Sequence, residues 1–219
     1  MRPAGRAARL ADGPVVLRPP RRRDAPDWVR ARVRGQDWLE PWEASAPELA
    51  GTPWGARQTA SSFLALRRTL RHAARRGSAV SFVITHAGEF AGMASAADIT
   101  RGAARTAALG YWLDERLAGR GIGTTAVGLL VDHCFATVGL HRLEAWVRPE
   151  NTASRRLLAR LGFREEGVAR ASLWVDGAWR DHVVCARCED DPVVPRSRMP
   201  DPGAVQGIST RIEERRSVG

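Results

Sequence analysis

The sequence predicts an α/β fold of the α+β kind, in which helices flank one mixed β-sheet. Three observations predict this class. Short apolar runs that begin and end near turn residues are typical of strands. Two longer segments, around residues 123–138 and 150–163, repeat their apolar residues with the 3.6-residue period of a helix. Strand and helix patterns then alternate in the second half of the chain, which favours a sheet with crossover helices.

The elements follow from turn and capping residues. Asp24 can cap a first helix and Gly35 can end it, while Ala87 and Gly88 form a hairpin turn. Gly162 is suited to end the last helix in a left-handed conformation. Strands are predicted at 15–18, 79–85, 90–100, 106–114, 141–148, 167–175 and 179–187, and helices at 24–34, 57–76, 123–138 and 150–163. About seven strands and four helices result.

One domain is predicted, over residues 13–188. Residues 1–12 read as a basic, disordered lead-in, and residues 189–219 as a flexible, proline-rich tail. The chain contains no run of 18 apolar residues, so no membrane span is expected. The basic N-terminus lacks the apolar core of a secretory signal, and we therefore expect a cytoplasmic protein, either monomeric or homodimeric.

Basic residues are unusually uniform, because all 34 are arginine and the chain contains no lysine. A phosphate-binding loop of the Walker A type requires lysine, and so does a Schiff-base or pyridoxal-phosphate enzyme. Both classes are excluded. The net charge of +10 favours an anionic partner such as RNA, the ribosome or a phosphorylated ligand, although genome composition also accounts for an arginine bias.

Three cysteines are present, and Cys185 and Cys188 form a single CxxC pair. A structural zinc site needs four ligands, and no second pair follows in the sequence. We therefore expect free thiols near a strand end in a reducing compartment, and no metal.

The segment LAGRGIGTTAVG, residues 117–128, is the strongest candidate binding site. Alternate glycines before a helix let backbone N–H groups approach a phosphate, and the helix N-terminus adds positive charge. The frame from Gly121 to Ala126 fits a dinucleotide fingerprint with Glu144 as the ribose ligand. However, DERLAGR separates it from the preceding strand, at least three strands come before it, and no second nucleotide-binding half follows.

A second frame, from Ala118 to Gly123, resembles the Q/R-x-x-G-x-G/A pattern of the GNAT superfamily of acetyl-CoA-dependent N-acetyltransferases. Ala118 departs from the pattern at its first position. The flanking segments LGYWL and GLHRLEAWVRPENTASRRLLARLGF are similar to the strand–loop–helix–strand–helix core of that superfamily. LEPWE and EEGVARASLWVDGAWRDHVVCA resemble its ribosomal-protein-alanine acetyltransferases of the RimJ/RimL type. The resemblance covers about residues 13–188.

The resemblance implies that acetyl-CoA is the cosubstrate and that its acetyl group passes directly to an amine. In this superfamily two strands, here 107–113 and 142–148, splay apart around the pantetheine. The implied coenzyme-binding residues are Trp112, Leu113, Ala118, Gly119, Arg120, Gly121, Ile122, Gly123, Thr124, Asn151 and Ser154. For Asn151 and Ser154, helix capping is the structural alternative.

Three residues have implied catalytic roles. A backbone N–H near Leu113 would face the thioester oxygen. Ser154 matches the hydroxyl that protonates the departing thiolate, while the position at which many relatives carry a tyrosine acid is Leu158. The positions where relatives carry a base, near Ala108 and Trp146, are not acidic. Glu144 lies on the same strand face as Trp146 and is one candidate for the base, and Glu43 and Asp98 are other options.

Residues 36–55, QDWLEPWEASAPELAGTPWG, are predicted to form a long aromatic loop. The acceptor amine is expected to meet this loop at Trp38, Trp42 and Glu43, with Asp98 as a further carboxylate. Deprotonating an α-amine of pKa about 7.7–8.0 costs about 1 kcal/mol near pH 7, whereas a lysine amine costs about 4–5 kcal/mol. A site without a clear base therefore favours a protein N-terminus, such as that of a ribosomal protein. A small amine (an antibiotic, a polyamine or an amino acid) and a non-catalytic RNA-binding role remain as alternatives.

Overall fold

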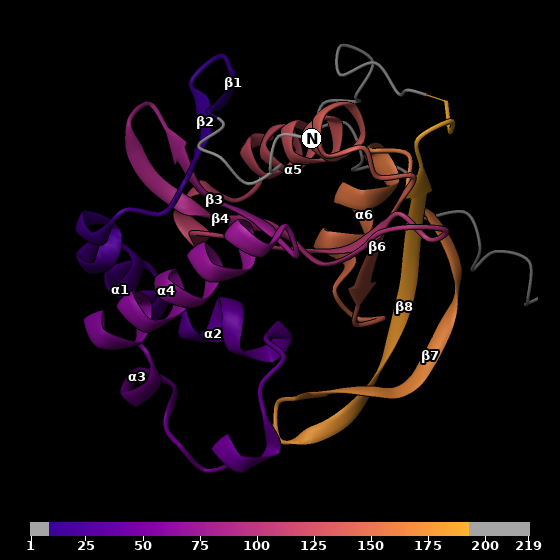
Figure 1. The fold of residues 1–219 in the computed structure, drawn as a ribbon. Helices are drawn as coiled ribbons and strands as arrows, with labels where there is room; N and C mark the ends of the chain where they lie inside the picture. The colour runs from indigo at the N-terminus through magenta and orange to yellow at the C-terminus, as the bar shows by residue number, and fades with distance from the viewer. Residues whose placement is uncertain (1–8, 193–219) are drawn as a thin grey trace, which may run out of the picture.

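The computed structural model describes residues 9–192 and shows one mixed sheet with helices on both faces (Figure 1). The strand order is β1-β2-β3-β4-β5-β6-β8-β7. The strands are β1 Leu10–Asp12, β2 Val15–Arg18, β3 Val80–His86, β4 Glu89–Thr100, β5 Thr106–Leu113, β6 Arg142–Val147, β7 Arg164–Val175 and β8 Ala178–Cys188. The predicted mixed α/β sheet is confirmed, but it has eight strands rather than seven.

The additional strand is β1, which the sequence analysis placed within a disordered lead-in. Its three residues pair antiparallel with β2, and Leu10 packs against the core. The predicted tail from residue 189 begins with ordered contacts, since the N–H of Glu189 donates to the His141 carbonyl at 2.8 Å. The remainder of that tail, residues 193–219, lies outside the described residues.

Two helical layers enclose the sheet. The helices are α1 Ala25–Arg34, α2 Gln36–Leu39, α3 Trp54–Arg57, α4 Ala60–Arg76, α5 Ile122–His133 and α6 Thr152–Arg160. α1 and α4 pack together over β3 and β4, whereas α5 contacts α6 and the strands from β1 to β5 (Figure 1). The larger apolar core lies under α5 and the smaller one under α1 and α4. Within residues 9–192, no helix has both the length and the apolar character required to cross a bilayer.

The main helices begin and end where capping chemistry permits. Thr59 caps α4, because its hydroxyl accepts the N–H of Ser62 at 3.1 Å, and Gly77 ends the helix with φ of 70°. α5 follows Gly121 and continues through a wider turn, Cys134–Val138, to Gly139. This agrees with the predicted helix at 123–138.

The aromatic segment at 36–55 is not the long loop that the sequence predicts. It consists of α2, α3 and two short 3-10 turns, Glu40–Trp42 and Pro47–Leu49. Trp54 explains part of the difference, because its buried ring anchors α3 and its Nε1 donates to the Arg32 carbonyl at 2.8 Å. The predicted helix at 57–76 consequently starts later, at Ala60.

The sheet separates in its centre. β5 and β6 pair in parallel only from Thr106 with Arg142 to Ala108 with Glu144. Beyond that point β5 stays paired with β4 as far as Leu113, while β6 stays paired with β8 as far as Val147. The predicted splay between these strands is therefore confirmed.

Candidate active site

The glycine loop connects the end of β5 to α5. Gly119 and Gly121 adopt φ values of 75° and 77°, and a Cβ built on either one would meet no atom within 4 Å. Gly123 differs, since its Cβ would lie 3.2 Å from the Leu157 side chain. The first turn of α5 carries no acidic residue. The loop therefore offers open backbone and the positive end of a 12-residue helix, as an anionic ligand requires.

The remaining residues of the predicted coenzyme loop differ in how far their side chains are exposed. Arg120 is exposed and Ala118 half-buried, so both border the open side of the loop. Ile122 and Thr124 are buried, and Ile122 belongs to the core below α5. For Ile122 and Thr124, contact with a ligand in this conformation would therefore be made mainly through the backbone.

A buried carboxylate anchors the start of this loop. Asp114 follows β5 and accepts hydrogen bonds from the side chains of Arg34 at 2.6 Å and Arg116 at 2.9 Å. Burial alone would raise the pKa of Asp114, but the hydrogen bonds from Arg116 and the charge of Arg34 hold it below its ordinary value. This stabilising contribution is present above pH 3.8 and is lost as the pH falls below that value.

A pair of hydroxyl groups bridges the splay. Tyr111 lies on β5 and Ser154 on α6, and their side-chain oxygens are 2.8 Å apart. Burial raises the pKa of Tyr111, so this phenol stays protonated. Asn151 caps α6, because its Oδ1 accepts the N–H of Ser154 at 3.0 Å. The capping role of Asn151 is thus real, and it occupies the side-chain oxygen while leaving the amide nitrogen without a partner among the described residues.

The neighbouring residues of β5 point to both faces of the sheet. Leu113 packs against the core on the α5 side, whereas the Trp112 ring packs beside Phe90 with centroids 5.8 Å apart. The Trp112 carbonyl points toward Gly92 of β4, so the structure does not turn the predicted coenzyme residue Trp112 toward the splay. Trp38 of α2 reaches the same strand end, since its Nε1 donates to the Leu113 carbonyl at 3.2 Å.

A buried arginine organises the contacts between α1, segment 40–57 and β5. The guanidinium of Arg32 lies 5.0 Å from the ring of Trp28, 4.7 Å from Trp54 and 5.4 Å from Trp112. It donates to the Gln58 side chain at 2.6 Å and to the Glu43 carboxylate. Glu43 is thereby held near Trp112 at the end of β5, and no pattern in the sequence identified Arg32 as its partner.

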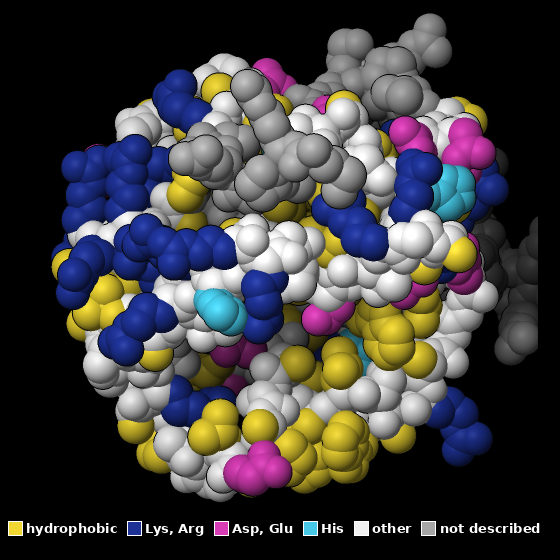
Figure 2. Space-filling model, in the orientation of Figure 1, with side chains coloured by type: hydrophobic (Ala, Val, Ile, Leu, Met, Phe, Trp, Pro, Cys, Tyr) yellow, Lys and Arg dark blue, Asp and Glu magenta, His cyan; other side chains and the backbone are white. Residues whose placement is uncertain are grey.

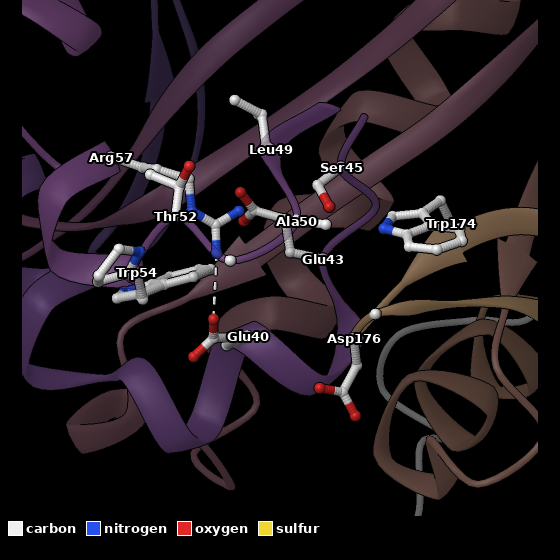
Figure 3. A pocket seen from close by; sticks show the side chains of 13 residues that line it. Glu40, Glu43, Ser45, Leu49, Ala50, Thr52, Trp54, Arg57, Trp174 and Asp176 are labelled. Atoms are coloured by element: carbon white, nitrogen blue, oxygen red, sulfur yellow. Dashed lines mark hydrogen bonds and ion pairs between the residues drawn. The ribbon is translucent and has the colours of Figure 1, made fainter. Parts of the chain in front are cut away.

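A cavity of about 300 Å³ opens next to Glu43 (Figure 3). Its walls come from the segment 40–57 and from the tip of the β7–β8 hairpin, where Trp174 of β7 and Asp176 of the turn lie. The two walls are joined by the N–H of Ser45, which donates to the Trp174 carbonyl at 3.0 Å. Inside the cavity, Arg57 donates to the Glu40 carboxylate at 3.0 Å.

The other predicted acceptor and base residues are dispersed. Trp42 lies near this cavity and stacks under Arg148, whose guanidinium is 5.5 Å from the ring centroid. Glu144 is bound by Arg142 at 2.9 Å. Asp98 is exposed and has φ of 53°. It lies near one end of β4, whereas Gly92, which pairs with Leu113, lies near the other end. The structure therefore does not bring Asp98 together with the other site residues.

Two residues that the sequence analysis did not select belong to this region, namely Tyr111 and Arg32. Tyr111 is the only tyrosine in the chain and lies within LGYWL, so its uniqueness was an available signal. Arg32 is one of 34 arginines, and nothing in the sequence distinguishes it. Among residues 9–192, no group of three or more His, Cys, Asp or Glu side chains is arranged to hold a metal ion.

Comparison with known proteins agrees with this geometry. The family model described as an acetyltransferase (GNAT) domain matches residues 15–164. The [ribosomal protein uS5]-alanine N-acetyltransferase of Escherichia coli is 31% identical over 185 residues, which cover 84% of this chain and 92% of that protein. A probable N-acetyltransferase of Bacillus subtilis, YjcK, is 46% identical over 100 residues, but the match spans only 55% of its length.

A solved structure supports the same assignment. RimJ of Mycobacterium smegmatis, in complex with CoA-disulfide, is 45% identical and superposes with a TM-score of 0.77, covering 83% of this chain and 86% of that one. The open glycine loop, the splayed strands and these matches lead to one conclusion: the chain belongs to the GNAT family of N-acetyltransferases.

Proposed function

We propose that this enzyme transfers the acetyl group of acetyl-CoA to the N-terminal α-amino group of a protein, with a ribosomal protein as the acceptor. The observation that carries the proposal is the similarity to the E. coli uS5-alanine N-acetyltransferase, which extends over 84% of the chain. It includes both walls of the cavity, the splay and the glycine loop. Such a substrate class would place the enzyme in the cytoplasm.

The coenzyme fits the glycine loop for a physical reason. The left-handed residues Gly119 and Gly121 have free space at the position of a Cβ, so a diphosphate could approach their backbone closely. The amide nitrogen of Asn151, which has no partner within residues 9–192, is available to bind pantetheine. Backbone groups of Leu113 border the splay in which pantetheine would lie, whereas the Trp112 carbonyl points toward β4.

The chemistry would take place at the end of β5. The amine attacks the thioester carbon, the N–H of Leu113 stabilises the developing oxyanion, and the C–S bond breaks as the sulfur leaves with its electron pair. Ser154 gives a proton to that thiolate and recovers one from water. Tyr111 holds the Ser154 hydroxyl at 2.8 Å, which favours one orientation of that proton.

The cavity favours a peptide over a polycation. Of its carboxylates, Glu40 is paired with Arg57 and Glu43 with Arg32. A polyamine or aminoglycoside site would need uncompensated negative charge, and these pairs remove most of it. Because the Glu43 carboxylate is engaged by Arg32, it is not free to act as a base, and the site is better suited to an α-amine than to lysine.

The charge of the outer surface would suit an acceptor protein that is bound to RNA. Figure 2 shows arginine side chains gathered over the side formed by α1 and α4. α4 contains no acidic residue, and its exposed residues Arg68, Arg71 and Arg75 form no ion pair with a described residue. The positive charge of this surface would favour acetylation close to ribosomal RNA. It does not require a separate, non-catalytic RNA-binding function.

A peptide assay tests the proposed acceptor. We expect free thiol to be released from acetyl-CoA with peptides that begin with Ala, Ser or Met and contain no lysine. The same peptides with a blocked N-terminus and one internal lysine should react at least about 100-fold more slowly, because the lysine amine is about 2.5 pKa units more basic. Equal rates on both sets, or rates confined to small polyamines, would contradict the proposal.

The coenzyme site has its own test. Gly121→Val is expected to weaken coenzyme A binding in calorimetry by at least about tenfold, since one lost charge-assisted hydrogen bond is worth about 1.5–3 kcal/mol. Gly102→Val is the matched control, because Gly102 has a similar φ of 72° and the same free space but lies in the β4–β5 turn. If both variants bind equally well, the loop is not the diphosphate site.

A further inference from the structure

A buried histidine lies on the acceptor side of the sheet. His182 of β8 is 3% exposed, and its neighbours Val183 and Cys185 belong to the core below α5. Because successive strand residues alternate in direction, His182 points to the opposite face. Val184 shares that face and pairs with Trp146, so His182 and Trp146 also lie on one face.

Strand register places His182 level with the end of β5. Val147 of β6 pairs with Val183, so the next residue, Arg148, lies beside His182. Ala108 of β5 is level with Glu144, and the same register brings Trp112 level with Arg148 across the splay. His182 is therefore at the height at which the thioester would lie. Segment 40–57 reaches the neighbouring residue Arg148, which donates to the Pro41 carbonyl at 3.0 Å.

Hydrogen bonding fixes one ring nitrogen and leaves the other without a partner. Nδ1 of His182 lies 3.0 Å from the Arg180 carbonyl and 3.0 Å from the Ser172 hydroxyl. The carbonyl can only accept, so Nδ1 carries the proton and Nε2 has the lone pair. Nε2 has no hydrogen-bond partner among the described residues. This atom is not completely buried, so solvent can reach it.

The surroundings favour a neutral ring. Burial lowers the pKa of His182 below its ordinary value of 6.5, and the charge of Arg148 lowers it further. The Arg180 carbonyl, Asp181 and Glu150 act in the opposite direction and do not reverse the shift. β7 contributes only the uncharged Ser172 hydroxyl to the ring. The imidazole is thus unprotonated near neutral pH.

We propose that His182 is the general base of the transferase, and that its Nε2 receives the proton lost by the acceptor amine. This assignment rests on the proposed function. The N–C bond forms as the C–S bond breaks, and the electron pair of the C–S bond leaves with sulfur. The amine proton passes to Nε2 and then to water, while the thiolate takes its proton from Ser154. His182 was not among the base candidates chosen from the sequence alone.

Two variants test the base. His182→Asn keeps a donor near the Arg180 carbonyl but removes Nε2, and we expect kcat with an Ala-starting peptide to fall about 100-fold. The KM for acetyl-CoA and the binding of coenzyme A should stay within about twofold of wild type, because His182 contacts neither in this role. Activity of His182→Ala should be partly restored by added imidazole. His141→Asn, on the half-exposed turn before β6, is the control and should behave as wild type with and without imidazole.

The pH profile gives an independent readout. A base acts when neutral, so the wild-type rate is retained above the pKa of His182 and is lost as the pH falls through that value, which lies below 6.5. This loss of rate at low pH should disappear in His182→Asn, so that the pH profile reports only the titration of the acceptor amine.

The outcomes separate the two proposals. An active wild type beside an equally active His182→Asn enzyme overturns this assignment alone. Loss of coenzyme A binding in both His182 variants without imidazole rescue gives His182 a structural role and overturns it as well. A wild type that binds coenzyme A but acetylates no peptide overturns the proposed function and this assignment with it.

Discussion

Replacing Gly92 with alanine is expected to lower the free energy of unfolding by more than about 3 kcal/mol. Gly92 lies in β4 opposite Leu113 and has φ of 152°. A Cβ there would lie 2.2 Å from the Trp112 carbonyl oxygen and 3.0 Å from the Leu113 Cα. Both are backbone atoms that cannot rotate away, so β4 and β5 would have to separate. Chemical denaturation monitored by tryptophan fluorescence measures the change.

The same substitution should also reduce kcat, because the displaced atoms belong to the strand end that would bind the thioester. Gly102→Ala is the control for backbone conformation, since Gly102 has φ of 72° and no atom near its Cβ position. It should cost about 1–2 kcal/mol and leave kcat unchanged. Equal destabilisation by the two substitutions would show that the close approach of β4 to β5 has little energetic importance.

The second large effect is expected at Arg32. Arg32→Met fills a similar volume but removes the charge, and it should lower the free energy of unfolding by about 3 kcal/mol. It leaves the buried Gln58 side chain without its partner and abolishes the contacts with three indole rings. Because Glu43 is also released, KM for a peptide acceptor should rise.

Arg30→Met on the same helix is the matched control. Arg30 forms an exposed i,i+3 pair with Asp27, and exposed pairs of this kind contribute little. Its removal should change stability by less than about 0.5 kcal/mol. If Arg32→Met unfolds at the same denaturant concentration as Arg30→Met, the contacts of Arg32 with Gln58, Glu43 and the three indole rings do not stabilise the protein.

The sequence predicted the central part of the fold because its patterns are local. The strand at 106–114, the glycine turn and the two periodic helices are each visible within about fifteen residues. β1 was missed, since Leu10–Asp12 is too short for any period to appear. The segment 36–55 was read as a loop because its short helices depend on the burial of Trp54 beside Arg32, which lies on another element.

The site was harder to predict than the fold. Glycine loops and helix caps are encoded within a few residues, so Gly121 and Asn151 could be chosen from the sequence. The partners Tyr111 and Ser154 are 43 residues apart and meet only because β5 leaves β6. His182 is identified by strand register and by which ring nitrogen is occupied. Asp98 has the right chemistry but lies at the opposite end of its strand.

The divergence of β5 from β6 also determines where backbone N–H and C=O groups lack a neighbouring strand. An exposed strand edge invites pairing with another chain. Here the outer edges are poor templates, since β1 has three residues and β7 is interrupted by two register shifts. Two further free edges face each other inside the sheet, beyond Ala108 and Glu144. A slender extended molecule can enter that gap and hydrogen-bond along it, whereas a second polypeptide sheet cannot, so ligand affinity is gained there without a matching risk of aggregation.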